Sequence, residues 1–346
     1  MHDFFRAQGE RDYRVAQVER WIYREGVNDF DAMTNLPVEL RARLKAYAQI
    51  SNPTVVHEIK SADGLTRKSL LRLADGETIE TVLMLYDDAP RGRNVSPIRL
   101  YKRKTVCIST QVGCPIKCPF CATGQAGYIR NLTVGEIVAQ VLHYARVAGA
   151  LTNVVVMGMG EPFMQFDVTW RALETLCDPK RFALSARRIT VSTSGEIPGI
   201  EKMARAKSQI NLAVSLHAAD DELRNVLVPL NRKYPLRALM RAVKAYSART
   251  HRRVTFEYAL MDNVNDQLEH ARALAQMVKG MLCHVNLIPL NPTATEKFRR
   301  SPYARVKSFQ KILQDAGIPT TLRVEKGIEI AAGCGMLRQH ESPRHS

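Results

Sequence analysis

The chain has 346 residues, of which 45% are hydrophobic and 24% charged, the composition of an ordinary soluble protein with a substantial core. No apolar run approaches the ~18 residues of a membrane-spanning helix, and the N-terminus lacks a signal-peptide layout, so we expect a cytoplasmic protein. The 50 Lys and Arg against 34 Asp and Glu give a net charge of +16, which favours a polyanionic substrate over a small anionic metabolite. Seven cysteines, an odd number, argue against a disulfide scaffold and indicate metal or catalytic use.

The N-terminal third predicts two small units. Apolar residues at helical spacing in 11–25 and 38–48 predict a helical unit over residues 1–52. Three β-rich runs follow, at 54–59, 68–73 and 79–86. Ala-Asp-Gly stands in both gaps between them, which is typical of tight turns between antiparallel strands. We therefore expect an antiparallel β extension with a basic loop over residues 53–104.

From residue 105 the pattern alternates between apolar strands and helices. The strand candidates are 105–110, 153–159, 188–193, 211–216, 253–260 and 284–288, with helices near 133–148, 166–177, 198–206, 235–249, 267–280 and 303–316. Six such βα units predict an α/β fold with a parallel sheet, curled into an open TIM-like barrel over 105–338 and followed by a polar tail at 339–346. The chemistry of such barrels collects at the C-terminal ends of the strands.

A cysteine motif follows the first barrel strand directly. Cys114, Cys118 and Cys121 lie in Cys-Pro-Ile-Lys-Cys-Pro-Phe-Cys, spaced by three and then two residues. Three thiolates on one loop can hold three irons of a [4Fe-4S] cluster and leave the fourth iron open to a small molecule. A zinc knuckle or three merely adjacent thiols are the alternatives. Zinc would need a fourth ligand, and the nearest downstream histidine, His143, lies in an apolar helical stretch.

Polar residues and glycines gather at the other strand ends. The second strand ends in Met-Gly-Met-Gly-Glu-Pro at 157–162, where Gly160 lets a ligand approach the backbone and Glu161 can hold an ammonium group. The later strand ends supply Ser192, Ser215, Leu216, His217 and Asn291. Each alone is as consistent with a cap or turn. Together, around one barrel mouth, they predict a nucleoside pocket. The three-plus-two spacing of the cysteines resembles that of the radical S-adenosylmethionine (SAM) enzymes, which implies that this pocket binds SAM.

Basic residues cluster in two segments. One, from 91 to 104, has no acidic residue and contains Arg91, Arg93, Arg99, Lys102, Arg103 and Lys104. The other contains Lys297, Arg299, Arg300, Arg305 and Lys307, interleaved with Phe298 and Tyr303. Either segment alone could be a solvated loop. The two together, with aromatics that can stack on bases, favour nucleic-acid binding.

Two further cysteines make a family resemblance specific. Cys107 lies on the first barrel strand, and Cys334 lies in a glycine-flanked segment, whereas Cys177 and Cys283 read as small core residues. The chain resembles the RlmN/Cfr family of radical SAM RNA adenine methyltransferases over nearly its whole length. The resemblance rests on Ile-Glu-Thr-Val at 79–82, Val-Cys-Ile-Ser-Thr-Gln-Val-Gly-Cys at 106–114, the cysteine motif, the segment at 157–162, Arg-Ile-Thr-Val-Ser at 188–192, Ser-Leu-His at 215–217, Asn-Leu-Ile-Pro-Leu-Asn-Pro at 286–292 and Ala-Ala-Gly-Cys-Gly at 331–335.

The resemblance implies a mechanism with two SAM molecules and a [4Fe-4S] cluster. Cys334 would carry a methyl group taken from one SAM, and a radical derived from the second would activate it for transfer to an adenine carbon. Glu80 would accept the ring proton, and Cys107 would resolve the protein–RNA adduct by forming a transient disulfide with Cys334. The competing classes are a radical SAM enzyme of protein or small molecules, and a non-catalytic Fe–S or zinc nucleic-acid-binding protein.

The resemblance also implies the substrates and partners. We expect methylation of C2 of an adenosine in 23S rRNA and of adenosine 37 in tRNA, with C8 methylation of 23S rRNA as the alternative. The N-terminal unit would be an RNA-binding accessory. A flavodoxin- or ferredoxin-type electron donor is expected, and the protein is expected to be a monomer that binds no membrane.

Overall fold

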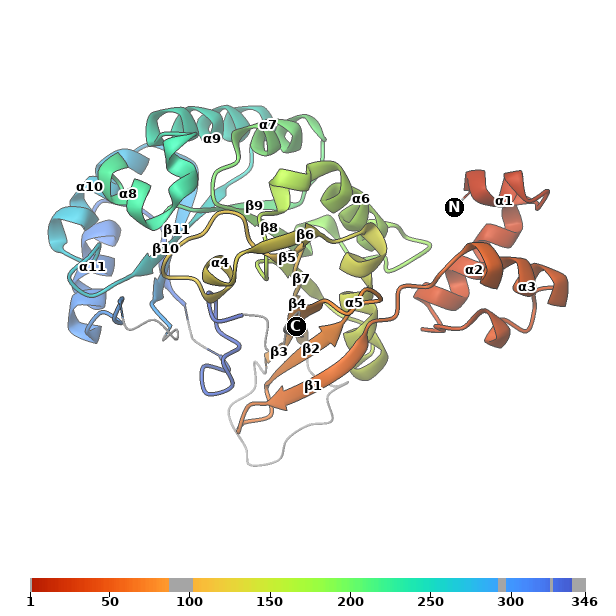
Figure 1. Ribbon diagram of the computed structural model, residues 1–346. Helices are drawn as coiled ribbons and strands as arrows, with labels where there is room; N and C mark the ends of the chain where they lie inside the picture. The colour runs from red at the N-terminus through yellow and green to blue at the C-terminus, as the bar shows by residue number, and fades with distance from the viewer. Residues whose placement is uncertain (1, 87–101, 292–296, 324–325, 338–346) are drawn as a thin grey trace.

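The computed structural model describes residues 2–86, 102–291, 297–323 and 326–337. Its centre is a 10-stranded sheet in the order β1-β2-β3-β4-β7-β8-β9-β10-β11-β12. Within this sheet the strands β4, β7, β8, β9, β10, β11 and β12 run parallel to one another, and β1, β2, β3 and β4 pair antiparallel. The sheet curls into an open barrel with helices along its outside (Figure 1). The expected α/β barrel with parallel strands is confirmed.

All six predicted barrel strands are present. They are β4 (Arg103–Cys107), β7 (Asn153–Val156), β8 (Ile189–Thr193), β9 (Asn211–Ser215), β10 (Val254–Leu260) and β11 (Cys283–Pro289). A further short strand, β12 (Thr320–Leu322), adds to the edge at β11, and the sequence pattern did not indicate it because three residues carry no periodicity. The face of the sheet opposite Cys107, Ser192 and Ser215 is apolar, with Val106, Val154, Val191 and Val214 fully buried.

Amphipathic helices cover the outer face of the sheet. The main ones are α5 (Val134–Ala148), α6 (Phe166–Cys177), α7 (Ile197–Arg205), α9 (Leu236–Thr250), α10 (Leu268–Val278) and α11 (Tyr303–Asp315). Shorter turns at the strand ends are η3 (Pro162–Gln165), η4 (Ala186–Arg188), α8 (Asp221–Leu227) and η5 (Pro229–Arg232). Helix α5 begins with a capping box, in which the Thr133 hydroxyl accepts from the Glu136 N–H and the Glu136 carboxylate accepts from the Thr133 N–H.

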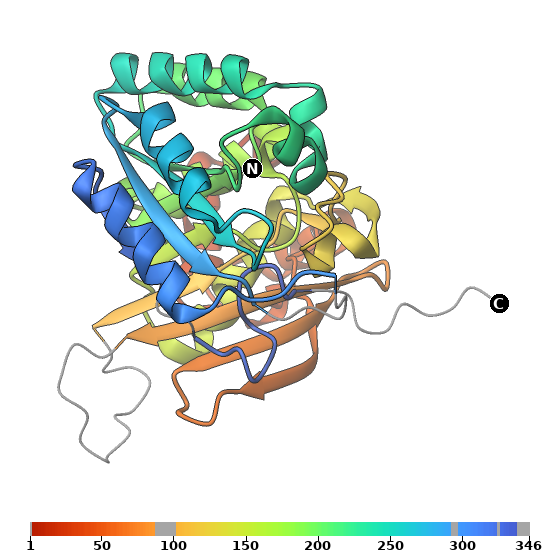
Figure 2. The ribbon, with the colours of Figure 1, turned by 90° about the vertical axis from the view of Figure 1, so that its left-hand side faces the viewer.

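The antiparallel strands extend the barrel sheet directly. Strands β1 (Thr54–Lys60), β2 (Thr66–Arg72) and β3 (Thr78–Tyr86) match the predicted runs, and β3 pairs with β4. Figure 2 shows these strands continuing the sheet at the lower end of the barrel. The register places Lys68 opposite Val82 and Val82 opposite Cys107. Paired residues share a face of a sheet, so side chains of the extension reach the barrel interior beside the first barrel strand.

Residues 2–47 form a helical unit. It contains α1 (His2–Ala7), α2 (Asp12–Tyr23), η1 (Phe30–Ala32) and α3 (Val38–Tyr47), and it stands at one side of the barrel beside α5 and α6 (Figure 1). Two polar contacts join the helical unit to the barrel. Arg146 Nε of α5 donates to the Gly26 carbonyl at 2.8 Å, and Arg181 forms an ion pair with Glu19 at 2.6 Å. No helix within the described ranges is long and apolar enough to cross a membrane.

Candidate active site

A small hairpin holds the cysteine motif at the mouth of the barrel. Strands β5 (Gln111–Gly113) and β6 (Tyr128–Asn131) pair on either side of the loop, and the loop ends in the short helix α4 (Ala122–Ala126). Gly113 has φ +76°, and a Cβ there would lie 2.0 Å from the Gly127 carbonyl oxygen, so the hairpin requires glycine at this position. The sequence did not reveal this hairpin because its strands are too short to show alternation.

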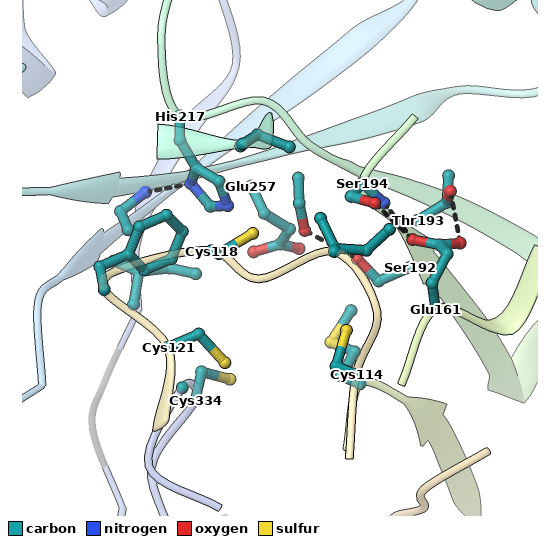
Figure 3. Close-up of a pocket in the computed structure, with 18 of the residues that line it drawn as sticks. Cys114, Cys118, Cys121, Glu161, Ser192, Thr193, Ser194, His217, Glu257 and Cys334 are labelled. Carbon is teal, nitrogen blue, oxygen red and sulfur yellow. Dashed lines mark hydrogen bonds between the residues drawn. The ribbon is translucent and has the colours of Figure 1, made fainter. Parts of the chain in front are cut away.

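The three motif thiols line one pocket. Figure 3 shows Cys114, Cys118 and Cys121 placed around the pocket rather than meeting at one point. Burial raises the pKa of Cys114 to about 12 and that of Cys118 well above its ordinary value, while the pKa of Cys121 is also raised by burial. A buried trio of this kind stays neutral unless a cation compensates its charge. Bound iron supplies that charge, and separate thiolates suit a cluster in which each holds one iron.

A small apolar group packs the cysteine loop onto the ends of β10 and β11. It consists of Ile116, Phe120, Leu227, Val228, Ala259, Met261 and Leu290, with the motif cysteines against it. Gly124 lies just past the motif, and a Cβ there would come within 2.8 Å of the Cys118 backbone nitrogen. The conformation of the cysteine loop is therefore stabilised by these apolar contacts and by the close approach of backbone at Gly124.

Glu161 closes one side of the pocket. One oxygen of its buried carboxylate accepts from the Thr193 hydroxyl at 2.7 Å and the Phe163 N–H at 3.1 Å. The other accepts from the N–H and the hydroxyl of Ser194, at 2.7 and 2.6 Å (Figure 3). Burial raises the pKa of Glu161, and these hydrogen bonds oppose that shift. The predicted ammonium-binding carboxylate thus lies in the pocket wall, joined to the end of β8.

The predicted polar residues of β8 and β9 meet in the same pocket. The Ser192 and Ser215 hydroxyls lie 3.3 Å apart. His217, just beyond β9, accepts the Ala259 N–H at Nδ1 over 3.0 Å and contacts the Phe120 ring edge-on. Burial, helped by Arg224, lowers the pKa of His217 to about 3. The ring is therefore neutral, and because Nδ1 is an acceptor, Nε2 carries the hydrogen and can donate to a ligand.

The segment that carries Cys334 contributes Cys334 and Gly335 to the pocket wall. Asn291 Nδ2 donates to the Cys334 carbonyl at 3.0 Å, and the Ala122 N–H donates to the Gly335 carbonyl at 2.8 Å. The buried Asn291 Oδ1 has no partner among the described residues. Cys334 lines the pocket beside Cys121 (Figure 3). A polar ligand in the pocket would satisfy this amide oxygen, and the site brings Cys334 together with the motif thiols.

Glu80 and Cys107 lie on the inner face of β3 and β4, and Cys107 is close to Cys334. Burial raises the pKa of Cys107 to about 12; the nearby Cys334 raises it further, and Arg323 opposes this. Both cysteines are free thiols. Glu80 lies two residues from Val82, the partner of Cys107, and so shares its face. Its buried carboxylate pairs with Lys68 at 2.8 Å.

Family models and individual relatives point to the same family. Residues 108–275 match the radical SAM superfamily, and residues 1–50 match the N-terminal domain of the ribosomal RNA large subunit methyltransferase RlmN. A protein of Chloroflexus aurantiacus named probable dual-specificity RNA methyltransferase RlmN is 46% identical, over 99% of this chain and 90% of its own. The dual-specificity RNA methyltransferase RlmN of Halorhodospira halophila is also 46% identical, over 96% and 89%.

A crystal structure agrees with these sequence relatives. A radical SAM methyltransferase from Sphaerobacter thermophilus superposes with a TM-score of 0.90 at 48% identity, covering 97% of this chain and 96% of its own. The chain belongs to the RlmN family. The cofactors of this RlmN-family chain are those of the radical SAM superfamily, a [4Fe-4S] cluster and SAM. Of the residues described above, the motif thiols fit the cluster, and the polar groups at the ends of β8, β9 and β11 fit SAM.

The structure distinguishes among the remaining predicted residues. Leu216 is fully buried and outside the pocket lining, while Gly160 lines the pocket. Lys102, Arg103, Arg299 and Arg300 are exposed. Lys104, in contrast, is buried and its Nζ donates to the Ala148 carbonyl at 2.8 Å, so it closes the end of α5 rather than facing solvent. Arg91, Arg93 and Arg99 lie outside the described residues.

Two arginines at or beside the pocket of this RlmN-family protein were not predicted from the sequence. Arg224 is buried and donates to the Ser194, Ser215 and Leu216 carbonyls, which ties together the ends of β8 and β9. Burial lowers the pKa of Arg224 to about 10, and Cys118 opposes this. Arg323, just past β12, lines the pocket, and Cys334 is the main cause that raises its pKa, opposed by burial. Nothing local in the sequence marks either residue, because their partners lie on distant strands.

Proposed function

We propose that this RlmN-family protein methylates C2 of an adenosine in 23S rRNA and of adenosine 37 in tRNA, with Cys334 as the methyl carrier. The observation that carries the proposal is the position of Cys334, in the wall of the pocket that holds the three motif thiols and close to Cys107. A cluster-binding protein without methyl transfer has no use for a second thiol pair beside the cluster loop. The names of the relatives, dual-specificity RNA methyltransferases, support two classes of RNA substrate.

The chemistry follows from the target atom. C2 of adenine is electron-poor and does not displace a methyl group from a sulfonium by ordinary attack. When bound, the cluster and SAM supply the one-electron chemistry that activates a methyl group for such a carbon. The Cys334 thiolate is a good nucleophile and takes the methyl group of a sulfonium donor by displacement, and the donor leaves as a neutral thioether. Arg323 beside it compensates the negative charge of that thiolate.

Two residues on the inner face of the sheet complete the reaction. Glu80 accepts the proton that leaves the ring carbon once the methylene bridge between Cys334 and the base has formed. Cys107 then attacks the Cys334 sulfur. The carbon–sulfur bond to the RNA breaks as the Cys107–Cys334 disulfide forms, its electron pair stays with the methylene carbon, and that carbon takes up a proton to become the methyl group. An external two-electron reductant restores both thiols.

The same proposal covers the partners. A flavodoxin- or ferredoxin-type protein supplies electrons to the cluster, and the protein acts as a monomer. Residues 1–52 bind RNA as an accessory unit, supported by the match of residues 1–50 to the RlmN N-terminal domain. The exposed Lys102, Arg103, Arg299 and Arg300 contact phosphates, which positions the RNA without reading its sequence.

Mass spectrometry and a trapping experiment test this function. The isolated protein should carry a methyl group on Cys334. Cys107→Ala should accumulate an RNA adduct through Cys334 on a denaturing gel, whereas Cys107→Ala/Cys334→Ala should not. Absence of both the methyl group and the adduct would refute the assigned roles.

The methylated position is tested separately. Nuclease digestion of the RNA product should release 2-methyladenosine. Release of 8-methyladenosine would favour the alternative, C8 methylation of 23S rRNA. The relatives named RlmN favour the C2 product.

A further inference from the structure

Lys68 is a buried charged residue that has no role in the reaction proposed above. It lies on β2, and its side chain is 6% exposed. Its ammonium nitrogen lies 2.8 Å from Oε1 of Glu80 and donates to the Ala331 carbonyl at 3.2 Å. Burying an ammonium group without a partner is costly, and these two contacts offset that cost. Both contacts lead to the proposed site, because Glu80 is the proton acceptor and Ala331 lies three residues before Cys334.

The pairing of β2 with β3 and of β3 with β4 brings the reacting groups onto one face of the sheet. Lys68 lies opposite Val82, and Glu80 lies two residues before Val82, so the side chains of all three project from the same face. Cys107 of β4 lies opposite Val82 on its other side. The ammonium group of Lys68 therefore lies on the face that carries both the proton acceptor and the resolving thiol.

The backbone of Glu80 is held independently of Lys68. Its carbonyl accepts from the Ser109 hydroxyl at 2.7 Å, and that hydroxyl accepts in turn from the Met159 N–H at 2.9 Å. The Glu80 N–H donates to Sδ of Met159 at 3.4 Å. These contacts place the main chain of Glu80, whereas the charge of its buried carboxylate depends on the cation that lies against it.

Strand β2 also supports the segment that leads to Cys334. Ala331 has φ +51°, a left-handed conformation that is unfavourable for alanine, and the hydrogen bond from Lys68 to its carbonyl helps to stabilise this conformation. Thr66 projects from the same face of β2 as Lys68 and lies against Gly327, where a Cβ would come within 2.7 Å of Thr66 Cγ2. One nitrogen atom thus contacts the proton acceptor and the segment of the methyl carrier at once.

We propose that Lys68 is a positioning residue for the proton transfer, which keeps the Glu80 carboxylate ionised and joined to the segment that carries Cys334. The inference rests on the proposed function and adds to it the group on which the proton acceptor depends. As the proton leaves C2 of the base, the carbon–hydrogen bond breaks, its electron pair stays with the base, and the proton bonds to a carboxylate oxygen. Only the ionised carboxylate can accept this proton. Burial favours the neutral acid, whereas an ammonium group 2.8 Å away favours the charged form.

Two variants of Lys68 test this role with Cys107 intact. Lys68→Met removes the charge, whereas Lys68→Arg keeps the charge but places a wider guanidinium group against the carboxylate. When proton transfer is slow, the base stays joined to Cys334. Both variants should therefore accumulate, on a denaturing gel, the RNA adduct that the wild type resolves, with less in Lys68→Arg. Product formation in a single turnover should fall by about 100-fold in Lys68→Met, as expected for a misplaced catalytic group.

An isotope effect distinguishes this role from a purely structural one. The substrate is an anticodon stem–loop RNA with deuterium at C2 of the target adenosine. Deuterium should slow Lys68→Met by a larger factor than it slows the wild type, because proton transfer has become the slow step. Glu80→Gln provides the matched control: in that background Lys68→Met should change the single-turnover rate by no more than about twofold, since no carboxylate is left to position. An isotope effect equal to that of the wild type, or the full 100-fold loss in the Glu80→Gln background, would overturn the proposal.

The adduct of Cys107→Ala separates this inference from the proposed function. An adduct in Cys107→Ala but none in either Lys68 variant would overturn the role of Lys68 and leave the proposed function intact. No adduct in any of the three proteins would overturn the proposed function, and this inference with it. If circular dichroism shows that Lys68→Met does not fold, Lys68→Arg, which keeps the buried charges paired, decides the question by the same gel and isotope measurements.

Discussion

The buried ion pair between Lys68 and Glu80 gives the sharpest test of how this site is held together. The two charged atoms are 2.8 Å apart, and the side chains are 6% and 3% exposed. Lys68 Nζ also donates to the Ala331 carbonyl at 3.2 Å, three residues before Cys334. One ammonium group therefore joins the predicted proton acceptor to the segment of the predicted methyl carrier.

Replacing either partner should cost stability to a different extent. Lys68→Met leaves the Glu80 carboxylate buried beside an apolar side chain and removes the contact to Ala331, so we expect a loss of about 3–5 kcal/mol in the free energy of unfolding. Glu80→Gln keeps a hydrogen-bonding group of the same shape and leaves the contact to Ala331, so it should cost less. The double variant should cost less than the sum of the two, because it removes both charges of the pair together.

Urea denaturation of the apoprotein, followed by circular dichroism, measures these differences as shifts in midpoint. An exposed pair provides the matched control: Lys311 and Asp315 lie 3.0 Å apart with side chains 74% and 60% exposed. Lys311→Met should change stability by no more than about 0.5 kcal/mol. If Lys68→Met were no more destabilising than Lys311→Met, the reasoning from burial would be refuted.

Three further predictions concern the pocket and the basic segment. Burial lowers the pKa of His217 from 6.5 to about 3, so between these pH values the unfolded chain binds a proton that the folded protein does not. The free energy of unfolding should therefore be highest above pH 6.5 and should fall by about 2 kcal/mol by pH 5. Thermal melts at both pH values should show this loss in the wild type and not in His217→Asn. Gly124→Ala forces a Cβ within 2.8 Å of the Cys118 nitrogen, so iron per chain after anaerobic reconstitution should fall, and wild-type iron content would contradict this. Replacing the exposed Lys102 by Ser should flatten the plot of log RNA affinity against log salt concentration by about one unit of slope. Replacing the buried Lys104 by Ser should lower the stability of the protein and leave that slope unchanged. The reverse pattern would contradict our placement of the two lysines.

Features encoded in short stretches of the chain were predictable from the sequence. The cysteine motif is local, since three thiols within eight positions must share one loop, and the barrel strands are apolar runs long enough to recognise. Lys104 shows where such reasoning stops. It belongs to a run of basic residues that reads as a solvated loop, yet β4 has already begun at Arg103 and its alternation turns Lys104 toward the end of α5.

Contacts between distant segments were not predictable in this way. Lys68 is a charged residue in a strand whose sequence neighbours suggest no partner, and its two contacts come from β3 and the C-terminal segment. Arg323 and Arg224 are similar, because each acquires its role from strands that fold next to it. Such pairs depend on strand register, and a single residue of register changes which side chains face the interior.

The hydrogen bonds that hold the Cys334 segment in place are the clearest example of contacts that the sequence does not reveal. Its carbonyl groups accept hydrogen bonds from four places: from Lys68 to Ala331, from Asn291 to Cys334, from the Ala122 N–H to Gly335, and from the Thr123 hydroxyl to Leu337. Backbone acceptors are present in every residue, so no sequence pattern announces them. Because these contacts hold the segment by its backbone, the Cys334 side chain is left to project into the pocket of the three motif thiols. The proposed methyl carrier needs this arrangement, in which the backbone is held in place and the side chain lines the pocket.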